Sequence, residues 1–270
     1  MDILQVIILG LVQAITEWLP LSSKTMDTII YKDIFGGSPE SVISVLLFLH
    51  LGTLCAATVY FRKEILSSWG RFFRSPLPFR KHQNTEFGFV ATAVLFTGIV
   101  GVPILLVERY FLPTLDSAAL MTLMGAGLVV TGFLLTSQSK NRWRTAESVT
   151  WKDGMLTGAL QGLSTIPGVS RAGTSTTGLI WRGFDSESAF HLAFILSIPT
   201  VLIAEVVLWA AQGGVSAIPI SDGIALAVSS FIFGYITIRA LLQVAHRLNI
   251  AWLAFAFGIM MILFGLAGIG

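Results

Sequence analysis

Six apolar runs, each about 20 residues long, are distributed along this 270-residue chain. A bilayer core about 30 Å thick needs about 20 apolar residues to cross it as a helix, so each run predicts a membrane-spanning helix. The six predicted spans are Ser41–Phe61, Phe87–Val107, Ala118–Leu135, Ser188–Ala211, Gly223–Val244 and Ala251–Gly268. Only 12% of the residues are charged, about half of the roughly 25% of ordinary soluble domains. A soluble globular enzyme, a disordered chain and a nucleic-acid-binding protein are therefore excluded.

Two further apolar stretches are too short and too interrupted to be spans. Ile3–Leu19 stops at Pro20-Leu21-Ser22-Ser23-Lys24, and Gly154–Ile166 stops at Pro167-Gly168-Val169-Ser170-Arg171. Each is followed by a short, semi-polar stretch, Thr25–Tyr31 or Ala172–Trp181. A descent, a polar break and a return predict a re-entrant helical hairpin, because non-helical backbone at membrane depth is tolerated only inside protein or along a cavity. We therefore expect an all-α polytopic membrane protein with six transmembrane helices and two re-entrant hairpins.

The loops differ in their content of Lys and Arg. Basic residues concentrate after the first predicted span, in residues 136–153 and around the turn before the last span, whereas the alternate loops are poor in them. Since loops rich in Lys and Arg stay in the cytoplasm, this pattern predicts a multi-pass protein of the cell membrane with both termini outside. The first Lys is Lys24, so the N-terminus lacks the basic region of a cleavable signal peptide.

The two polar breaks match each other. Pro20-Leu21-Ser22-Ser23-Lys24 aligns with Pro167-Gly168-Val169-Ser170-Arg171 at an offset of 147 residues, and Gln13 matches Gln161 with a slip of one residue. We interpret the chain as a single membrane domain, residues 1–270, built from inverted-topology repeats of approximately 1–135 and 150–270 with the cytoplasmic loop 136–153 between them. Chance similarity between apolar segments is the alternative. Such repeats place functional sites near the membrane midplane, where the broken helices meet.

Polar residues at membrane depth are the candidate functional residues. Gln13 and Glu17 lie four residues apart, hence on one helix face. The residues that the two breaks add are Ser22, Ser23 and Lys24 in the first, and Ser170, Arg171, Thr174 and Ser175 in the second. Arginine suits bidentate phosphate recognition, and the start of a helix binds anions. The set predicts a site for a phosphate or diphosphate; the alternative is a structural ion pair between Glu17 and Arg171.

These motifs resemble the undecaprenyl-diphosphate phosphatase family, also known as bacitracin-resistance proteins. The matching segments are Gln13-x-x-x-Glu17, Leu19-Pro20-Leu21-Ser22-Ser23 and Pro167-Gly168-Val169-Ser170-Arg171-Ala172-Gly173-Thr174-Ser175. The resemblance runs nearly end to end and includes Asp153 before the second hairpin, the span count and the chain length. It implies a membrane hydrolase that converts polyprenyl (undecaprenyl) diphosphate to the monophosphate lipid carrier of cell-envelope assembly, at a site open to the outer face.

Residue by residue, the resemblance implies Glu17, Ser23 and Arg171 as catalytic residues, with Ser23 as nucleophile or phosphate donor. It implies substrate-binding roles for the remaining polar residues, which are Gln13, Ser22, Lys24, Ser170, Thr174 and Ser175. The family is described as dependent on a divalent cation, Mg²⁺ or Ca²⁺, and Glu17 is the residue expected to position that metal. The expected partners are the lipid substrate and the bilayer; the sequence leaves a homodimer open.

One departure from the family bears on function. The family reads Ser-Ser-x-Gly-His at the first break, whereas this chain reads Ser22-Ser23-Lys24-Thr25-Met26. A methionine can act neither as a nucleophile nor as a base, so either the chemistry runs through Ser23 and Glu17 or the protein moves the lipid phosphate instead of hydrolysing it. A flippase of polyprenyl phosphate is therefore the alternative function, and a transporter of a soluble phosphate-bearing solute is a third.

Two histidines and a glutamate also lie inside the apolar runs. His50 and His191 are expected to be packing or hydrogen-bonding residues, because neither lies near a second metal ligand in the sequence. Glu205 lies some six residues from the outer end of its predicted span. A position facing the cavity, a snorkelling role and an interhelical role are all open for it.

Overall fold

A computed structural model describes residues 1–19, 21–63, 65–66, 84–111, 115–137, 143–211, 217–245 and 250–268. Within these ranges the chain is helical, and the only strand-like feature is a single bridge between Arg144 and Phe184. The α-helices are α1 (Ile3–Trp18), α2 (Ser23–Ile29), α3 (Val42–Tyr60), α6 (Glu86–Phe111), α7 (Ser117–Thr136), α8 (Trp151–Gly162), α9 (Arg171–Trp181), α10 (Ser186–Ala211), α11 (Ile220–Ala245) and α12 (Ile250–Leu266). Shorter helical turns are Ile30–Ile34, Pro39–Ser41, Ala146–Ser148 and Leu163–Thr165.

The six longest predicted segments all form helices. The largest difference is at α6, which continues beyond the predicted Val107 to Phe111. Among the residues that the structure describes, five helices are long and apolar enough to cross a membrane, namely α3, α6, α7, α10 and α11. The chain is thus a polytopic helical membrane protein. The sixth segment, α12, is apolar but has only 17 residues, fewer than the roughly 20 residues that a full crossing needs.

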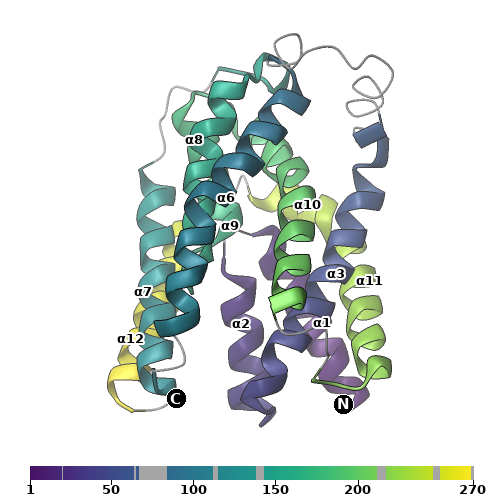
Figure 1. Cartoon of the computed structure of the whole chain (residues 1–270), viewed down its shortest axis with the longest axis vertical. Coiled ribbons are helices and arrows are strands. Elements are labelled where there is room, and N and C mark those ends of the chain that lie inside the picture. Colours follow the sequence, from purple (N-terminus) through teal and green to yellow (C-terminus); the bar gives the residue numbers. More distant parts are fainter. Residues whose placement is uncertain are drawn as a thin grey trace.

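The four helices around the two sequence breaks are short. α1 has 16 residues, α2 has 7, α8 has 12 and α9 has 11. At 1.5 Å per residue the longest of them measures about 24 Å, less than the bilayer core. In Figure 1, α1 and α2 occupy the lower half of the bundle, α8 the upper half, and both chain ends lie at the bottom.

Long helix pairs hold the bundle together: α7 packs along α12, α6 along α8, and both α1 and α3 along α11. Small residues allow the closest approaches. A Cβ added to Gly125 of α7 would overlap the Gly258 carbonyl of α12, and one added to Gly158 of α8 would overlap the Ala93 carbonyl of α6. Such small-residue contacts are typical of membrane helices, whose association depends on close packing.

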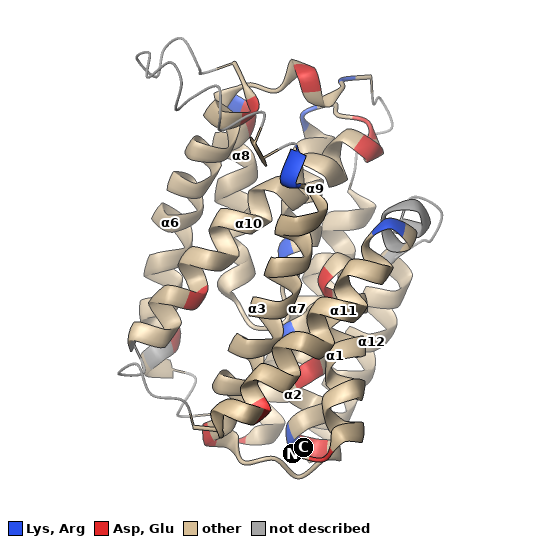
Figure 2. Ribbon diagram, turned by 90° about the vertical axis from the view of Figure 1, so that its right-hand side faces the viewer, with Lys and Arg blue, Asp and Glu red and all other residues tan. Residues whose placement is uncertain are grey.

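The main buried apolar cluster joins both halves of the chain. It gathers Trp18 of α1, Phe61 after α3, Phe89 of α6 and Phe194 of α10. Many large apolar side chains are instead exposed along the outer faces, including Leu95 of α6. Such a surface suits lipid and would be a liability in water. Figure 2 shows most acidic and basic residues at the two ends of the bundle, with a few midway along it.

Candidate functional site

The two breaks in the sequence meet in the folded protein. The Ser170 hydroxyl donates a hydrogen bond to the Leu21 carbonyl at 3.1 Å, and the Ser170 amide donates to the Thr131 hydroxyl of α7 at 3.0 Å. The turn before Ser170 depends on Gly168, which has a φ of +88° and lies against the Met124 carbonyl. Residues about 150 positions apart therefore share one site.

Glu17 is the centre of this site. Its Oε1 accepts a hydrogen bond from Arg171 Nη2 at 2.5 Å, and its Oε2 accepts from the Ser23 hydroxyl at 2.7 Å and from Gln13 Nε2 at 3.3 Å. Gln13 Nε2 also lies 3.2 Å from the Thr53 hydroxyl of α3. The Glu17 side chain is only 7% exposed. The structure thus brings together Gln13, Glu17, Ser23 and Arg171, which the sequence predicted as one site.

The other predicted hydroxyls surround this centre but bond elsewhere. Ser22 is buried and accepts a hydrogen bond from Thr25 at 3.0 Å. Thr174 and Ser175 are buried on α9 and donate to the Arg171 carbonyl of their own helix, at 3.0 Å and 2.8 Å. They would have to rotate to reach a ligand.

Lys24, next to Ser23, has a different setting. It is exposed and carries its charge near three acidic residues, Glu17, Glu108 and Glu205. The predicted substrate-binding set therefore divides into Gln13 bonded to Glu17, Ser170 bonded to the carbonyl of the other break, hydroxyls bonded within their own segments, and an exposed cation.

Two residues that sequence reasoning did not assign to the site adjoin it: His50 lies beside Glu17, and Glu205 lies beside His50. His50 Nε2 of α3 lies 3.7 Å from Glu17 Oε2, and His50 Nδ1 lies 3.6 Å from Glu205 Oε1 of α10. His50 forms a hydrogen bond with the Leu46 carbonyl, as expected of a hydrogen-bonding residue, and it also lies beside two carboxylates, because the packing of α1, α3 and α10 gathers all three. The criterion that selected Glu17, an ionisable residue inside an apolar segment, applied equally to His50 and Glu205.

Two residues of α2 follow Ser23 and face different surroundings. Asp27 is fully buried, and neither carboxylate oxygen has a hydrogen-bond partner in the described structure. Met26, at the position of the family's histidine, packs against the apolar cluster of Met124, Leu128 and Met261 between α7 and α12. The position that distinguishes this chain therefore serves packing.

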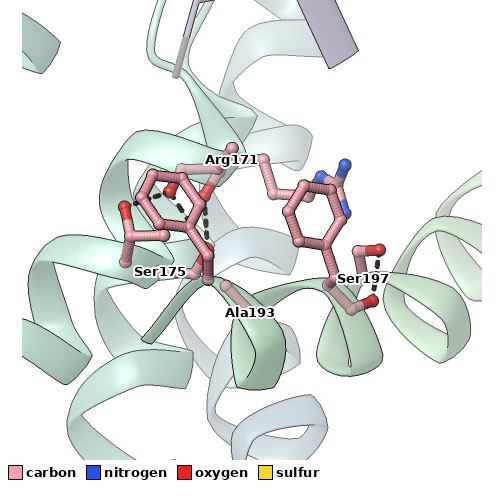
Figure 3. Close-up of a pocket in the computed structure, with 8 residues that line it drawn as sticks. Arg171, Ser175, Ala193 and Ser197 are labelled. Carbon is pink, nitrogen blue, oxygen red and sulfur yellow. Dashed lines mark hydrogen bonds between the residues drawn. The ribbon is translucent and has the colours of Figure 1, made fainter. Parts of the chain in front are cut away.

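A small pocket lies beside Arg171, between α9 and α10. Figure 3 shows Arg171 and Ser175 facing Ala193 and Ser197 across it. The remaining lining residues are Ala172, Thr176, Phe190 and Phe194. The pocket therefore combines a cation and hydroxyls with two phenyl rings.

The donor groups bear on the expected divalent cation. Both oxygens of Glu17 already accept hydrogen bonds, and no cluster of three His, Cys, Asp or Glu side chains suited to a metal occurs in the described ranges. The partnerless buried oxygens near Glu17 are Gln13 Oε1 and the two of Asp27. Hard oxygen donors of this kind suit Mg²⁺ or Ca²⁺, so the residues fit a cation that takes its other ligands from a substrate.

Asp153, at the start of α8, belongs to a second polar cluster. It lies near the bundle end opposite the chain termini and accepts hydrogen bonds from Arg144 at 2.8 and 2.9 Å and from Arg182 at 2.6 Å. Burial raises its pKa, but the hydrogen bonds from Arg144, Arg182 and Thr150 outweigh burial and lower the pKa to about 2. The cluster ties the loop before α8 to the end of α9.

Fold and site together define a polytopic helical membrane protein with a buried carboxylate, Glu17, that is bonded to a hydroxyl, an amide and a guanidinium. The chain belongs to the family described as bacitracin resistance protein BacA, and the sequence match to this family covers residues 6–267. Relatives named undecaprenyl-diphosphatase include those of Methanothrix thermoacetophila, 35% identical over 261 residues, and Methanococcoides burtonii, 32% identical over 265 residues. The two alignments cover 96% of this chain and 95% and 97% of the relatives.

Proposed function

We propose that this protein hydrolyses undecaprenyl diphosphate, or a closely related polyprenyl diphosphate, to the monophosphate and inorganic phosphate within the membrane. The observation that carries the proposal is the arrangement around Glu17, which accepts from the Ser23 hydroxyl on one oxygen and from Arg171 on the other. The name shared by the relatives supports the substrate and the reaction.

The three groups divide the chemistry between them. Ser23 Oγ attacks the terminal phosphorus while Glu17 takes its proton, because the hydroxyl already points at that carboxylate. Arg171 uses one nitrogen on Glu17, and its remaining N–H groups bind the diphosphate oxygens and stabilise their charge in the transition state. The bond from the terminal phosphorus to the bridging oxygen breaks, and polyprenyl phosphate leaves. Water then adds its oxygen to the phosphorus, the Ser23 Oγ–P bond breaks, and Oγ takes back the proton held on Glu17. Inorganic phosphate leaves with one proton of the water, and the other is released to solvent.

The pocket beside Arg171 suits the junction between a phosphate and a prenyl chain. Phe190 and Phe194 supply an apolar wall next to Arg171, and ligand sites generally combine an apolar lining with a few placed polar groups. We place the diphosphate at Arg171 and the first prenyl units along α10.

A divalent cation would be held by Asp27 and by Gln13 Oε1. Gln13 lies one helical turn before Glu17 on α1, and Asp27 lies one turn after Ser23 on α2. These helices are the two arms of the first hairpin, and both Gln13 and Ser23 donate to Glu17. When bound, the cation would neutralise diphosphate charge. Phosphate release with and without Mg²⁺, and after chelation, tests this part.

We further propose that both hairpins are re-entrant and related by an inverted repeat. The packing supports this. In such a repeat the helices α1, α2, α3, α6 and α7 correspond, in that order, to α8, α9, α10, α11 and α12. The packed pair α6–α8 then corresponds to the packed pair α11–α1, and the pair α7–α12 corresponds to itself. The termini are then outside, since the end of α3 and the start of α8, beside which basic residues lie in the sequence, are at the bundle end opposite the chain termini (Figure 1).

The names of the relatives favour the hydrolase over the flippase. The deciding experiment supplies farnesyl or undecaprenyl diphosphate to the purified protein and measures phosphate release. We expect release by the wild type, a loss of at least about 100-fold in S23A and E17Q, and near wild-type release in T28A, the matched control on α2. Transport of labelled polyprenyl phosphate across proteoliposomes without phosphate release would contradict the hydrolase and support the flippase.

A further inference from the structure

One face of α7 contacts both hairpins. This face follows the i, i+3, i+4, i+7 spacing of one side of a helix and consists of Met124, Gly127, Leu128 and Thr131. Met26 of α2 packs against its two apolar side chains. The second break lies against the rest of the face, since a Cβ added to Gly127 would overlap the Pro167 carbonyl, and the Ser170 amide donates to Thr131. Helix α7 therefore touches the segments that carry Ser23 and Arg171.

The hydroxyl of Thr131 has one hydrogen, and its direction is fixed. Thr131 Oγ1 lies 3.1 Å from the Gly127 carbonyl oxygen, and a carbonyl can only accept, so the hydroxyl donates to it. A lone pair of Oγ1 accepts the Ser170 amide hydrogen at 3.0 Å. Thr131 and Ser170 are 0% and 1% exposed, so without this hydroxyl the Ser170 amide would be a buried donor with no partner.

The hydroxyl of Ser170 is also fully used. It donates to the Leu21 carbonyl of the first break at 3.1 Å and accepts the Gly173 amide of α9 at 3.2 Å. Its single hydrogen is therefore engaged by the other break and is not directed at a ligand. These bonds give Ser170 a role in joining the two breaks, whereas the family resemblance implied a role in binding the substrate.

The hydrogen bonds form a series from α7 to both breaks. The Ser170 amide binds Thr131, and the Ser170 hydroxyl binds Leu21. Leu21 comes two residues before Ser23, and Ser170 comes directly before Arg171. Because α7 also packs along α12, it is a firm support for this series. The distance between the proposed nucleophile and the proposed phosphate-binding guanidinium thus depends on the Thr131 hydroxyl.

We propose that Thr131 is a positioning residue of the hydrolase reaction, which holds the Ser170 backbone so that Arg171 and Ser23 meet the diphosphate in register. This inference rests on the proposed function and adds a side chain from α7, a helix to which no role in the reaction was assigned above. Ser23 Oγ must reach the phosphorus that Arg171 holds. A shift of one group against the other therefore slows bond formation more than it weakens binding.

The test compares T131V with T131S in phosphate release from undecaprenyl diphosphate, expressed per folded molecule. Valine keeps the shape of threonine but lacks the hydroxyl, whereas serine keeps the hydroxyl and loses the methyl group. We expect T131V to lower kcat at least about tenfold with KM changed less than about twofold, and T131S to retain near wild-type kcat. Wild-type kcat in T131V, or an equal loss in T131S, would overturn the proposal.

The matched control is T122V on the same helix, where Thr122 donates to the Ala118 carbonyl within α7. It should keep kcat and KM. If T131V does not fold, T131C replaces it, because cysteine has the size of serine but its sulfur is only a weak acceptor. We then expect T131C to lose activity that T131S retains, and equal activity in the two would contradict the proposal.

A double-mutant cycle with S170A shows whether Thr131 acts through Ser170. S170A removes the hydroxyl that binds Leu21 and keeps the amide that binds Thr131. We expect T131V to lower kcat less in S170A than in the wild type, because residues of one hydrogen-bond network are not additive; fully additive losses would contradict the proposal. A wild type that releases no phosphate would refute the proposed function itself. An active wild type with T131V unchanged would remove only the positioning role.

Discussion

Arg171 and Glu17 join the two halves of the chain at the site, with Arg171 Nη2 donating to Glu17 Oε1 over 2.5 Å and a sequence separation of 154 residues. Such a pair serves structure and chemistry at once. The Arg171 side chain is 20% exposed while that of Glu17 is 7% exposed, so part of the Arg171 side chain remains accessible. The pocket between α9 and α10 lies on that open part.

Replacing Arg171 by lysine tests this double role. R171K keeps the charge but loses the planar fork of donors that can bind Glu17 and a phosphate together. We expect kcat/KM for undecaprenyl diphosphate to fall about 10- to 100-fold, the equivalent of about 1.4–2.8 kcal/mol. The measurement is phosphate release over a range of substrate concentrations.

The matched control is R62K, at the exposed end of α3, where Arg62 donates to the Val59 carbonyl. It should leave kcat/KM unchanged. If the Glu17–Arg171 pair is only structural, R171K will lower the midpoint of thermal unfolding while each folded molecule keeps full activity, and that outcome would contradict a role in substrate binding.

The sequence predicted the helices well and the site in part. Long apolar runs determine where a membrane helix lies, so α3, α7 and α10 begin and end within two residues of the predicted bounds. The contact between the breaks was predictable because both contain a Ser followed by a cation, in Ser23-Lys24 and Ser170-Arg171.

His50 and Glu205 could not be placed from the sequence, for a physical reason. α3 and α10 are apolar on every side, so no amphipathic pattern marks the face that turns toward Glu17. The direction in which Met26 points was equally hidden, since the same short helix α2 carries Ser23 toward Glu17 and Met26 toward Met124.

Restoring the family's histidine at position 26 should not increase activity. Met26 packs against Met124, Leu128 and Met261, so M26H would put a polar ring into an apolar contact without a partner, at a cost of about 1–3 kcal/mol. We expect a lower midpoint of thermal unfolding and unchanged or reduced phosphate release. M26L is the packing control and should retain stability. A large gain of hydrolysis in M26H would show instead that the native protein lacks a catalytic group at this position.

Asp153 should make the stability of the protein depend on pH in the acidic range. Its folded-state pKa, about 2, lies below the ordinary value of 3.8. The stabilisation is therefore fully present above about pH 4 and is lost as the pH falls through about 2. The difference corresponds to about 2 kcal/mol.

The variant D153N removes the carboxylate that pairs with Arg144 and Arg182. At pH 7 its midpoint of thermal unfolding should lie below that of the wild type, and the two should converge as the pH approaches 2. E147Q, on the exposed turn before α8, serves as the control. A D153N variant as stable as the wild type at pH 7 would contradict the structural role of this cluster.

Gly168 should be essential for activity because it shapes the turn that delivers Arg171. Its φ of +88° is unfavourable for any residue with a Cβ, and a Cβ there would overlap the Met124 carbonyl. G168A must therefore shift the turn and with it the start of α9, and a displacement of about 1 Å can cost about 100-fold in rate.

The control is G98A, because no atom lies within 4 Å of a Cβ added at Gly98 of α6, and alanine favours the helix by about 1 kcal/mol. We expect G98A to retain or gain stability and to keep full phosphate release. We expect G168A to lose at least about 90% of its phosphate release. Equal activity in the two variants would mean that the turn does not position Arg171.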